Sequence, residues 1–120
     1  MDLTMAAALG QAEAAHDLAV AASGEDRHRA LVLAAQFGHT EIVRLLLDAG
    51  ADPSRFNPAG FHPHSTPLHQ AALAGHFDTV KLLTERVARL DLKDTLWQAT
   101  PEGWALHAGK IEIAEYLRAH

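Results

Sequence analysis

Apolar residues recur along this chain in two kinds of segment that alternate. Longer stripes such as Ile42–Leu47 and Thr79–Leu83 place aliphatic side chains on one side of a helix. A short alanine-rich segment precedes each stripe, with Ala34-Ala35 before the first and Ala71-Ala72 before the second. Such small side chains let a neighbouring helix approach closely. The pattern predicts pairs of helices in which the first is thin and the second carries an aliphatic face.

Residues at the ends of these segments mark helix boundaries. Thr66 offers a side-chain acceptor at a helix start, and Pro67 occupies the first helical position, where its missing N–H costs nothing. Gly75 can adopt the left-handed conformation that ends a short helix. The intervening segments, rich in Pro, Gly, Asn and Asp, predict turns rather than strands. We expect residues 21–28 and 52–65 to be the loosest parts of the chain.

The helix pair is repeated along the chain. The segments 29–47, 66–83 and 100–117 align, so that Arg29, Thr66 and Thr100 stand 37 and 34 residues apart. A weaker copy lies at the start, where Ala6, Ala7 and Gly10 match Ala34, Ala35 and Gly38 at a spacing of 28 residues. Since one pair cannot bury its own apolar face, the units must stack on one another. The repeat therefore predicts four helix pairs, about eight helices.

The residues that carry the repeat are specific. They are Thr66-Pro67-Leu68-His69 with Ala71-Ala72 and Gly75-His76, and Gly38-His39 followed by Glu41-Ile42-Val43, Leu45-Leu46-Leu47 and Gly50-Ala51-Asp52. This pattern resembles the ankyrin repeat over nearly the whole chain. The resemblance implies an all-α solenoid of stacked helix-turn-helix units that forms a single domain, 1–120. We place the approximate repeats at 1–24, 25–61, 62–95 and 96–120, the first of them degraded.

Composition narrows the classes of partner. The chain has 10 Lys and Arg against 15 Asp and Glu, and its net charge of -5 disfavours nucleic acid and membrane surfaces. There is no cysteine, no apolar run that could span a bilayer and no signal peptide, so we expect a cytoplasmic protein. We expect no cofactor, and Asp48, Asp52, Asp91 and Asp94 near the turns suggest a partner with some basic character.

The resemblance implies a concave binding surface made by the first helices and by the turns between units, called fingers. Two fingers depart from the family pattern. The long finger, residues 52–65, is about four residues longer than usual and carries Phe56, Phe61, His62 and His64, and the short finger, residues 91–98, carries Trp97. With the variable positions of the first helices, they give a candidate binding set, namely Phe37, Phe61, His64, Gln70, Trp97, Trp104 and His107. We expect Phe37 and Trp104 to be partly exposed, and Trp97 to lie near Trp104 and the long finger.

Two further departures concern the scaffold. Glu102 stands where the third repeat has Leu68, and we expect it to point outward or to serve the first turn of its helix, because the last unit has one side open to water. Val87 stands where the second repeat has Gly50, so the helix end after Arg86 should differ from the one before Ala51.

Nine histidines in 120 residues raise the question of a chemical site. His39, His69 and His76 match the family pattern, in which they are structural, and we expect His16, His28 and His120 to be exposed. His62, His64 and His107 remain, with His69 at the base of the same finger. Imidazoles of this kind can bind zinc, but no acidic or thiolate ligand has a recognisable spacing, so we expect no metal.

The main hypothesis is a module that binds a partner protein or peptide, of unknown identity, through its concave face and fingers. No phosphate-binding loop, zinc-protease helix or nucleophile motif is present, which argues against an enzyme. One alternative stays open, namely a small-molecule binding protein or an enzyme. In it, His64, His69, Glu102 and His107 form an acid–base site beside the aromatic pocket of repeats three and four. Self-association through the N-terminal end is a further hypothesis, because that end has few polar residues.

Overall fold

Helices are the only regular secondary structure in the part of the chain that the structure describes. The computed structural model describes residues 1–86 and 88–120, and no strand occurs among them. Its helices are α1 (Leu3–Leu9), α2 (Ala12–Ala19), α3 (Gly24–Phe37), α4 (Thr40–Asp48), α5 (Pro67–Ala74), α6 (Phe77–Glu85), α7 (Pro101–His107) and α8 (Ile111–Ala119). The predicted all-α fold of eight helices is confirmed for these residues. Val87, where a different helix end was predicted, lies outside the described residues.

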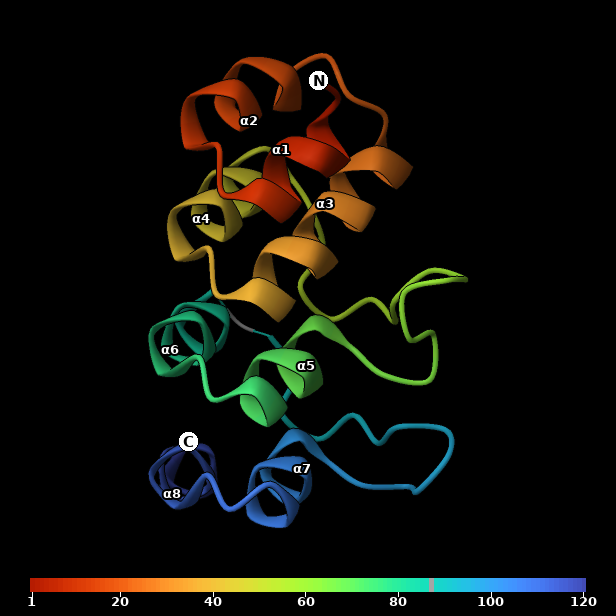
Figure 1. Ribbon diagram of the computed structural model, residues 1–120. Coiled ribbons are helices and arrows are strands. Elements are labelled where there is room, and N and C mark those ends of the chain that lie inside the picture. The colour runs from red at the N-terminus through yellow and green to blue at the C-terminus, as the bar shows by residue number, and fades with distance from the viewer. Residues whose placement is uncertain (87) are drawn as a thin grey trace.

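The helix pairs stack in one direction, as Figure 1 shows. The first helices α1, α3, α5 and α7 form one row, in which each contacts the next, and α2, α4 and α6 form a second row beside it. Both fingers project from the side of the first helices, away from the second row. This arrangement places the long finger beside α5 and the short finger beside α7.

Local sequence explains where the helices begin. Thr66 caps α5 through its hydroxyl, which accepts from the backbone N–H of His69, and Pro67 takes the first helical position as predicted. Thr100 and Pro101 repeat this arrangement at the start of α7. Each cap satisfies a backbone donor that has no partner within its helix.

The helix α3 begins earlier than expected. Ser23 accepts from the backbone N–H of Asp26 and starts α3 at Gly24, so residues 24–28 are helical and the prediction that they are loose is wrong. The additional turn matters because it carries His28, which points into the protein and is buried.

The core largely follows the predicted pattern, with small residues on the first helices and aliphatic residues on the second. Most alanines on the first helices are fully buried and allow close helix contact, while aliphatic side chains of the second helices, joined by Leu31, Val32 and Leu68 of the first, fill the space between units. The largest fully buried aliphatic side chains are Leu31, Val32, Ile42, Val43, Leu46, Leu68, Val80 and Leu83.

Successive units are joined by a contact between a histidine and a glycine. The imidazole of His39 lies on Gly10 and its Nε2 is 3.2 Å from the carbonyl oxygen of Ala8, and His76 lies on Gly38 with Nε2 3.0 Å from Gln36 O. Both glycines have positive φ, and a Cβ at either would come within 2.8 Å of the ring. The glycine and histidine of the repeat are therefore required together, because the ring fills the space that the missing side chain leaves.

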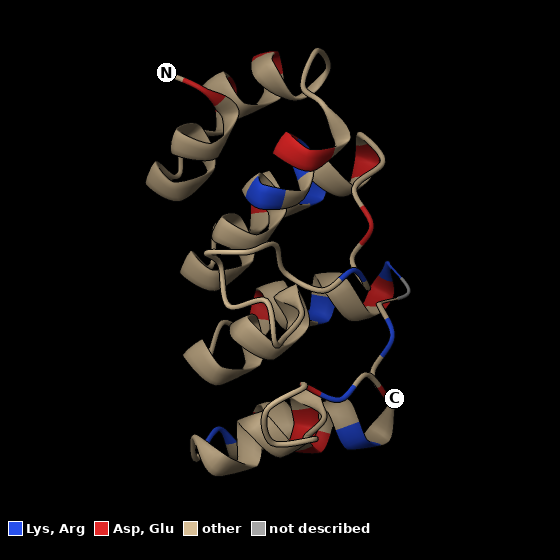
Figure 2. Ribbon diagram, turned by 90° about the vertical axis from the view of Figure 1, so that its right-hand side faces the viewer, with Lys and Arg blue, Asp and Glu red and all other residues tan. Residues whose placement is uncertain are grey.

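Charged residues are unevenly distributed. Most Lys, Arg, Asp and Glu residues lie along one edge of the stack, while the opposite edge, formed by the ends of the first helices, is largely free of them (Figure 2). The sequence 56–77 contains no such residue, and neither do 95–101 and 103–109. We call the inner face the surface formed by the exposed positions of α1, of α5, of residues 31–37 in α3 and of residues 103–107 in α7, together with the finger segments 56–65 and 95–98.

Candidate functional site

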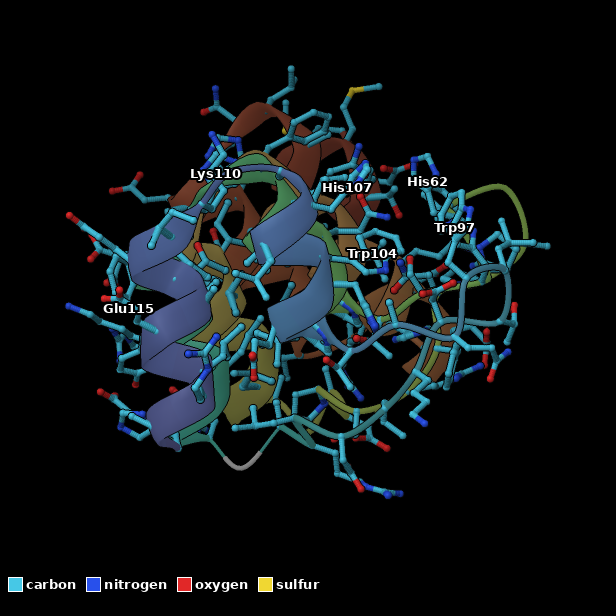
Figure 3. All side chains as sticks on the ribbon, turned by 90° about the horizontal axis from the view of Figure 1, so that it is seen from below. His62, Trp97, Trp104, His107, Lys110 and Glu115 are labelled. Atoms are coloured by element: carbon cyan, nitrogen blue, oxygen red, sulfur yellow. The ribbon has the colours of Figure 1, made fainter. Side chains whose placement is uncertain are left out.

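The main cavity of the described structure lies between the two fingers and helices α5 and α7. It has a volume of about 570 Å³ and is lined by His62, His64, Gln70, Leu73, Trp97, Ala99, Gly103, Trp104 and His107. We call it the inter-finger cavity. Viewed along the stack, Trp104 and His107 on α7 point towards His62 and Trp97 on the fingers, whereas Glu115 lies on the far side of α8 (Figure 3).

Asp94 shapes the short finger and fixes one wall of this cavity. Its side chain is 0% exposed. Its carboxylate accepts hydrogen bonds of 2.5 to 2.9 Å from the backbone N–H groups of Leu96, Trp97 and Ala99 and from the indole Nε1–H of Trp104. Burial alone would raise the pKa of Asp94, but these donors lower it to about 2. The carboxylate is thus charged at neutral pH and holds the backbone at Trp97 and the indole of Trp104 in place.

The two tryptophans and His64 form an aromatic cluster on the wall of the cavity. The centroids of Trp97 and Trp104 are 5.9 Å apart, and His64 lies 5.6 Å from Trp97 and 5.7 Å from Trp104. The prediction that Trp97 lies near Trp104 and the long finger is confirmed. Trp104 is only 7% exposed, so the expectation of partial exposure is wrong for it, whereas Trp97 is 69% exposed.

The long finger is closed at its base and tied to the short finger. The backbone N–H of Asn57 donates to Ser65 O at 2.8 Å, and the amide Nε2 of Gln70 donates to Ser65 Oγ at 3.0 Å. The backbone N–H of Thr95 donates to the carbonyl of His64 at 2.9 Å. Residues from two units therefore form one connected wall.

His69 holds the short finger from below and does not line the cavity. It is fully buried, its Nδ1 accepts from the backbone N–H and the hydroxyl of Thr66, and its Nε2–H donates to Ala99 O at 3.0 Å. Burial lowers the pKa of His69, against the opposing effect of the Ala99 carbonyl and the Asp94 carboxylate. The ring is neutral when folded, and both of its nitrogens are engaged.

His28 plays the matching role for the long finger. It is buried, and its Nε2–H donates to Phe56 O at 2.7 Å, so the prediction that it is exposed is wrong. Its Nδ1 is buried without a hydrogen-bond partner among the described residues, and burial lowers the pKa of the ring. The extra turn of α3 brings this histidine to the finger, which the alignment of repeats could not reveal.

These two buried histidines predict that acid destabilises the fold. A histidine whose pKa is lower in the folded state takes up a proton on unfolding, so its stabilising effect is complete above the unfolded pKa of about 6.5 and is lost as the pH falls below it. We expect the free energy of unfolding to fall between pH 7.5 and 5.5, by at most about 1.4 kcal/mol per pH unit for each histidine.

Urea denaturation at several pH values measures this dependence. The double variant His28→Gln, His69→Gln should show a smaller slope, whereas His16→Gln, which changes an exposed histidine on α2, should keep the slope of the wild type. A wild-type stability that does not change with pH in this range would contradict the prediction.

The residues of the predicted binding set are only partly brought together. His64, Gln70, Trp97, Trp104 and His107 line the inter-finger cavity. Phe37 lies outside it on the inner face and is 49% exposed, and Phe61 is half-buried in the long finger. Their role in binding stays a prediction.

The four residues of the acid–base hypothesis lie in different surroundings. His64 and His107 line the cavity, His69 is engaged by Thr66 and Ala99, and Glu102 faces α8, where it pairs with Arg118 at 3.3 Å. Of the four residues in that hypothesis, only His64 and His107 line the cavity. Among the described residues, no three His, Asp or Glu side chains are placed to share a metal ion.

Sequence reasoning missed some residues that matter here. The prediction that Asp94 is a surface charge favouring a basic partner is wrong, because Asp94 is buried and its carboxylate accepts from four donors. Asp48 and Asp91 are paired with Arg86 and Arg89, which weakens that expectation further. The turn after Asp94 was the available signal, because an aspartate commonly accepts from backbone N–H groups two and three residues later.

No described helix has the length and apolar content needed to cross a membrane.

Comparison with known proteins agrees with the fold. The family model described as ankyrin repeats (3 copies) matches residues 3–95. The cyclin-dependent kinase 4 inhibitor B of Bos taurus is 36% identical over 122 residues, which cover 98% of this chain and 90% of that protein. The cyclin-dependent kinase inhibitor 2A of Homo sapiens is 38% identical over 82 residues, 68% of this chain and 50% of that protein.

A third relative is similar to this chain over a small part of its own length. The ankyrin repeat and KH domain-containing protein mask-1 of Caenorhabditis elegans is 39% identical over 89 residues, which cover 74% of this chain but 3% of that protein. The similarity to the Bos taurus inhibitor, by contrast, spans most of both chains. The predicted family is confirmed: this chain belongs to the ankyrin-repeat family and is a protein-interaction module.

Proposed function

We propose that the chain binds its partner protein through the inner face and that a protein kinase is the partner class. The observation that carries the choice of surface is a row of exposed apolar side chains on successive first helices. The row comprises Met5, Leu9, Phe37 and Leu73 and continues to Trp97 on the short finger. A few side chains near the centre of an interface, often aromatic ones, supply most of its binding energy.

The lack of charge on this surface supports the same choice. Charged residues are depleted at the centre of protein interfaces, because their desolvation opposes binding. The ends of the first helices and the segment 56–77 fulfil this condition, and most charged residues lie along the opposite edge of the stack. The partner should therefore present an apolar, largely uncharged surface.

The choice of a kinase as the partner class rests on the names of two relatives, which describe inhibitors of cyclin-dependent kinases. Purified chain should show saturable binding to cyclin-dependent kinase 4 in biolayer interferometry. The absence of saturable binding would contradict the choice of a kinase.

A pair of matched variants tests the surface. Phe37→Asp should weaken binding by about 30-fold or more, which corresponds to the loss of about 2 kcal/mol expected for an anchor residue. Ile111→Asp changes an exposed aliphatic residue on α8, away from the inner face, and should leave the affinity unchanged. An equal loss in both variants would show that the partner does not use the inner face.

Two further expectations from the sequence stay proposals. The exposed side chains of Met1, Met5, Leu9 and Val20 support self-association at the N-terminal end. A cytoplasmic location is consistent with the absence of cysteine from the sequence.

A further inference from the structure

We propose that the inter-finger cavity binds an uncharged aromatic compound. This inference goes beyond the binding of a protein partner and does not depend on it. The cavity's volume of about 570 Å³ lies within the range of small-molecule sites, about 300 to 1,000 Å³. Such sites combine mostly apolar walls with a few convergent polar groups, and the inter-finger cavity has both.

The walls favour a flat ring system. Trp97 and Trp104 contribute two indole rings inclined at 68° to each other, and Leu73 from α5 provides an aliphatic surface. Ala99 and Gly103 have small or absent side chains, so the cavity extends to the backbone between them. Aromatic rings prefer offset or edge-to-face contact with other rings, and two rings at an angle offer both to a third.

The polar groups of the lining suit an uncharged ligand. Gln70 donates through Nε2 to Ser65, which leaves its amide oxygen available to accept from a ligand. His62, His64 and His107 add imidazole nitrogens, which can donate or accept. The lining contains no Asp, Glu, Lys or Arg, and the nearby carboxylate of Asp94 is already saturated by four donors. A charged ligand would lose its hydration in the cavity without gaining a partner of opposite charge.

Contacts within the protein hold the walls of the cavity in place. Asp94 fixes the indole of Trp104, and the bond from Thr95 to His64 joins the fingers. His62 and Gln98 both adopt a positive φ, of 63° and 55°, which is uncommon for residues other than glycine. Backbone conformations of this kind concentrate at functional sites, where the surrounding structure enforces them.

The protein itself supplies the reporter for the experiment. The chain contains 2 tryptophans, Trp97 and Trp104, and both line the cavity. In ¹⁵N-labelled protein, each gives one indole N–H signal that a ligand in the cavity should shift. We would titrate the isolated chain with indole, which is uncharged, and with indole-3-acetate and tryptamine, which carry the same ring with a negative and a positive charge.

Indole should shift both indole N–H signals saturably, with a dissociation constant below about 1 mM for a ligand of this size. The two charged analogues should bind at least about tenfold more weakly. Failure of indole to give a saturable shift would overturn the proposal, and binding of tryptamine or indole-3-acetate as tight as that of indole would overturn the assignment to an uncharged ligand. Because no partner protein is present, neither result bears on the inner face as a protein interface.

Two variants locate the binding. Leu73→Asp places a carboxylate on the wall of the cavity at a residue that is 40% exposed, so it should abolish indole binding while the spectrum stays that of a folded protein. Leu96→Asp introduces the same change on the short finger, at an exposed side chain that does not line the cavity, and should retain binding. Retained binding in Leu73→Asp, or equal loss in both variants, would show that indole does not occupy the cavity.

Discussion

Replacement of Asp94 by alanine is expected to lower the free energy of unfolding by about 3 to 5 kcal/mol. The carboxylate accepts from three backbone N–H groups and from the Trp104 indole, and the substitution leaves all four donors without their acceptor. A buried donor without a partner costs about 1 to 3 kcal/mol, and water reaching the donors that are only partly buried reduces the total below the sum. Urea denaturation followed by circular dichroism measures the loss.

Asp91 provides a matched control within the same finger. Its carboxylate is exposed and pairs with Arg89, so Asp91→Ala should leave the midpoint of denaturation unchanged. Asp94→Asn should fall between the two, because the amide keeps one acceptor oxygen but turns an NH2 group towards N–H donors. Equal midpoints for Asp94→Ala and Asp91→Ala would disprove the structural role of Asp94.

Replacement of His69 by alanine should lower the free energy of unfolding by about 3 to 4 kcal/mol. The imidazole is fully buried, so its removal leaves a cavity, and it deprives the Thr66 N–H and the Ala99 carbonyl of their partners. Chemical denaturation again measures the effect. The short finger should also lose its anchor, so amide hydrogen exchange at Thr95 and Ala99 should become faster than in the wild type.

The valine of the second repeat offers a way to separate packing from hydrogen bonding at this position. Val32 stands in the repeat where His69 stands one unit later, and it is fully buried. His69→Val restores part of the lost volume without restoring the hydrogen bonds. If His69→Val is as stable as the wild type, the polar contacts of His69 contribute nothing, and its ring serves only to fill space.

Much of the fold followed from local patterns. Short motifs such as Thr66-Pro67 and Gly38-His39 predict where helices begin and end, because capping, left-handed turns and helical spacing are local properties. The start of α3 was predicted incorrectly, since the alignment began at Arg29 whereas the cap at Ser23 adds a turn. Its consequence, a buried His28 bound to Phe56, depends on a contact across 28 positions of the sequence.

The candidate site was less accessible from sequence. The grouping of Trp97, Trp104 and His64 could be foreseen from the repeat register, which sets both fingers side by side. The repeat register does not predict the direction in which each side chain points. Trp104 is buried because its indole N–H is drawn to Asp94, ten residues earlier, and Glu102 turns to Arg118 rather than to the cavity. These side-chain directions are set by tertiary contacts, which no local sequence pattern encodes.

The near absence of charge along the inner face limits how this protein can discriminate among partners. A binding surface with formal charges rejects many wrong partners through like-charge repulsion or through an ion left unpaired. The stretch 56–77 provides no such charge, so unrelated apolar surfaces meet no electrostatic penalty there. Selectivity must then come from shape, and it depends on the geometry of the two fingers. Asp94 keeps the short finger in position, so selectivity depends on this residue as well.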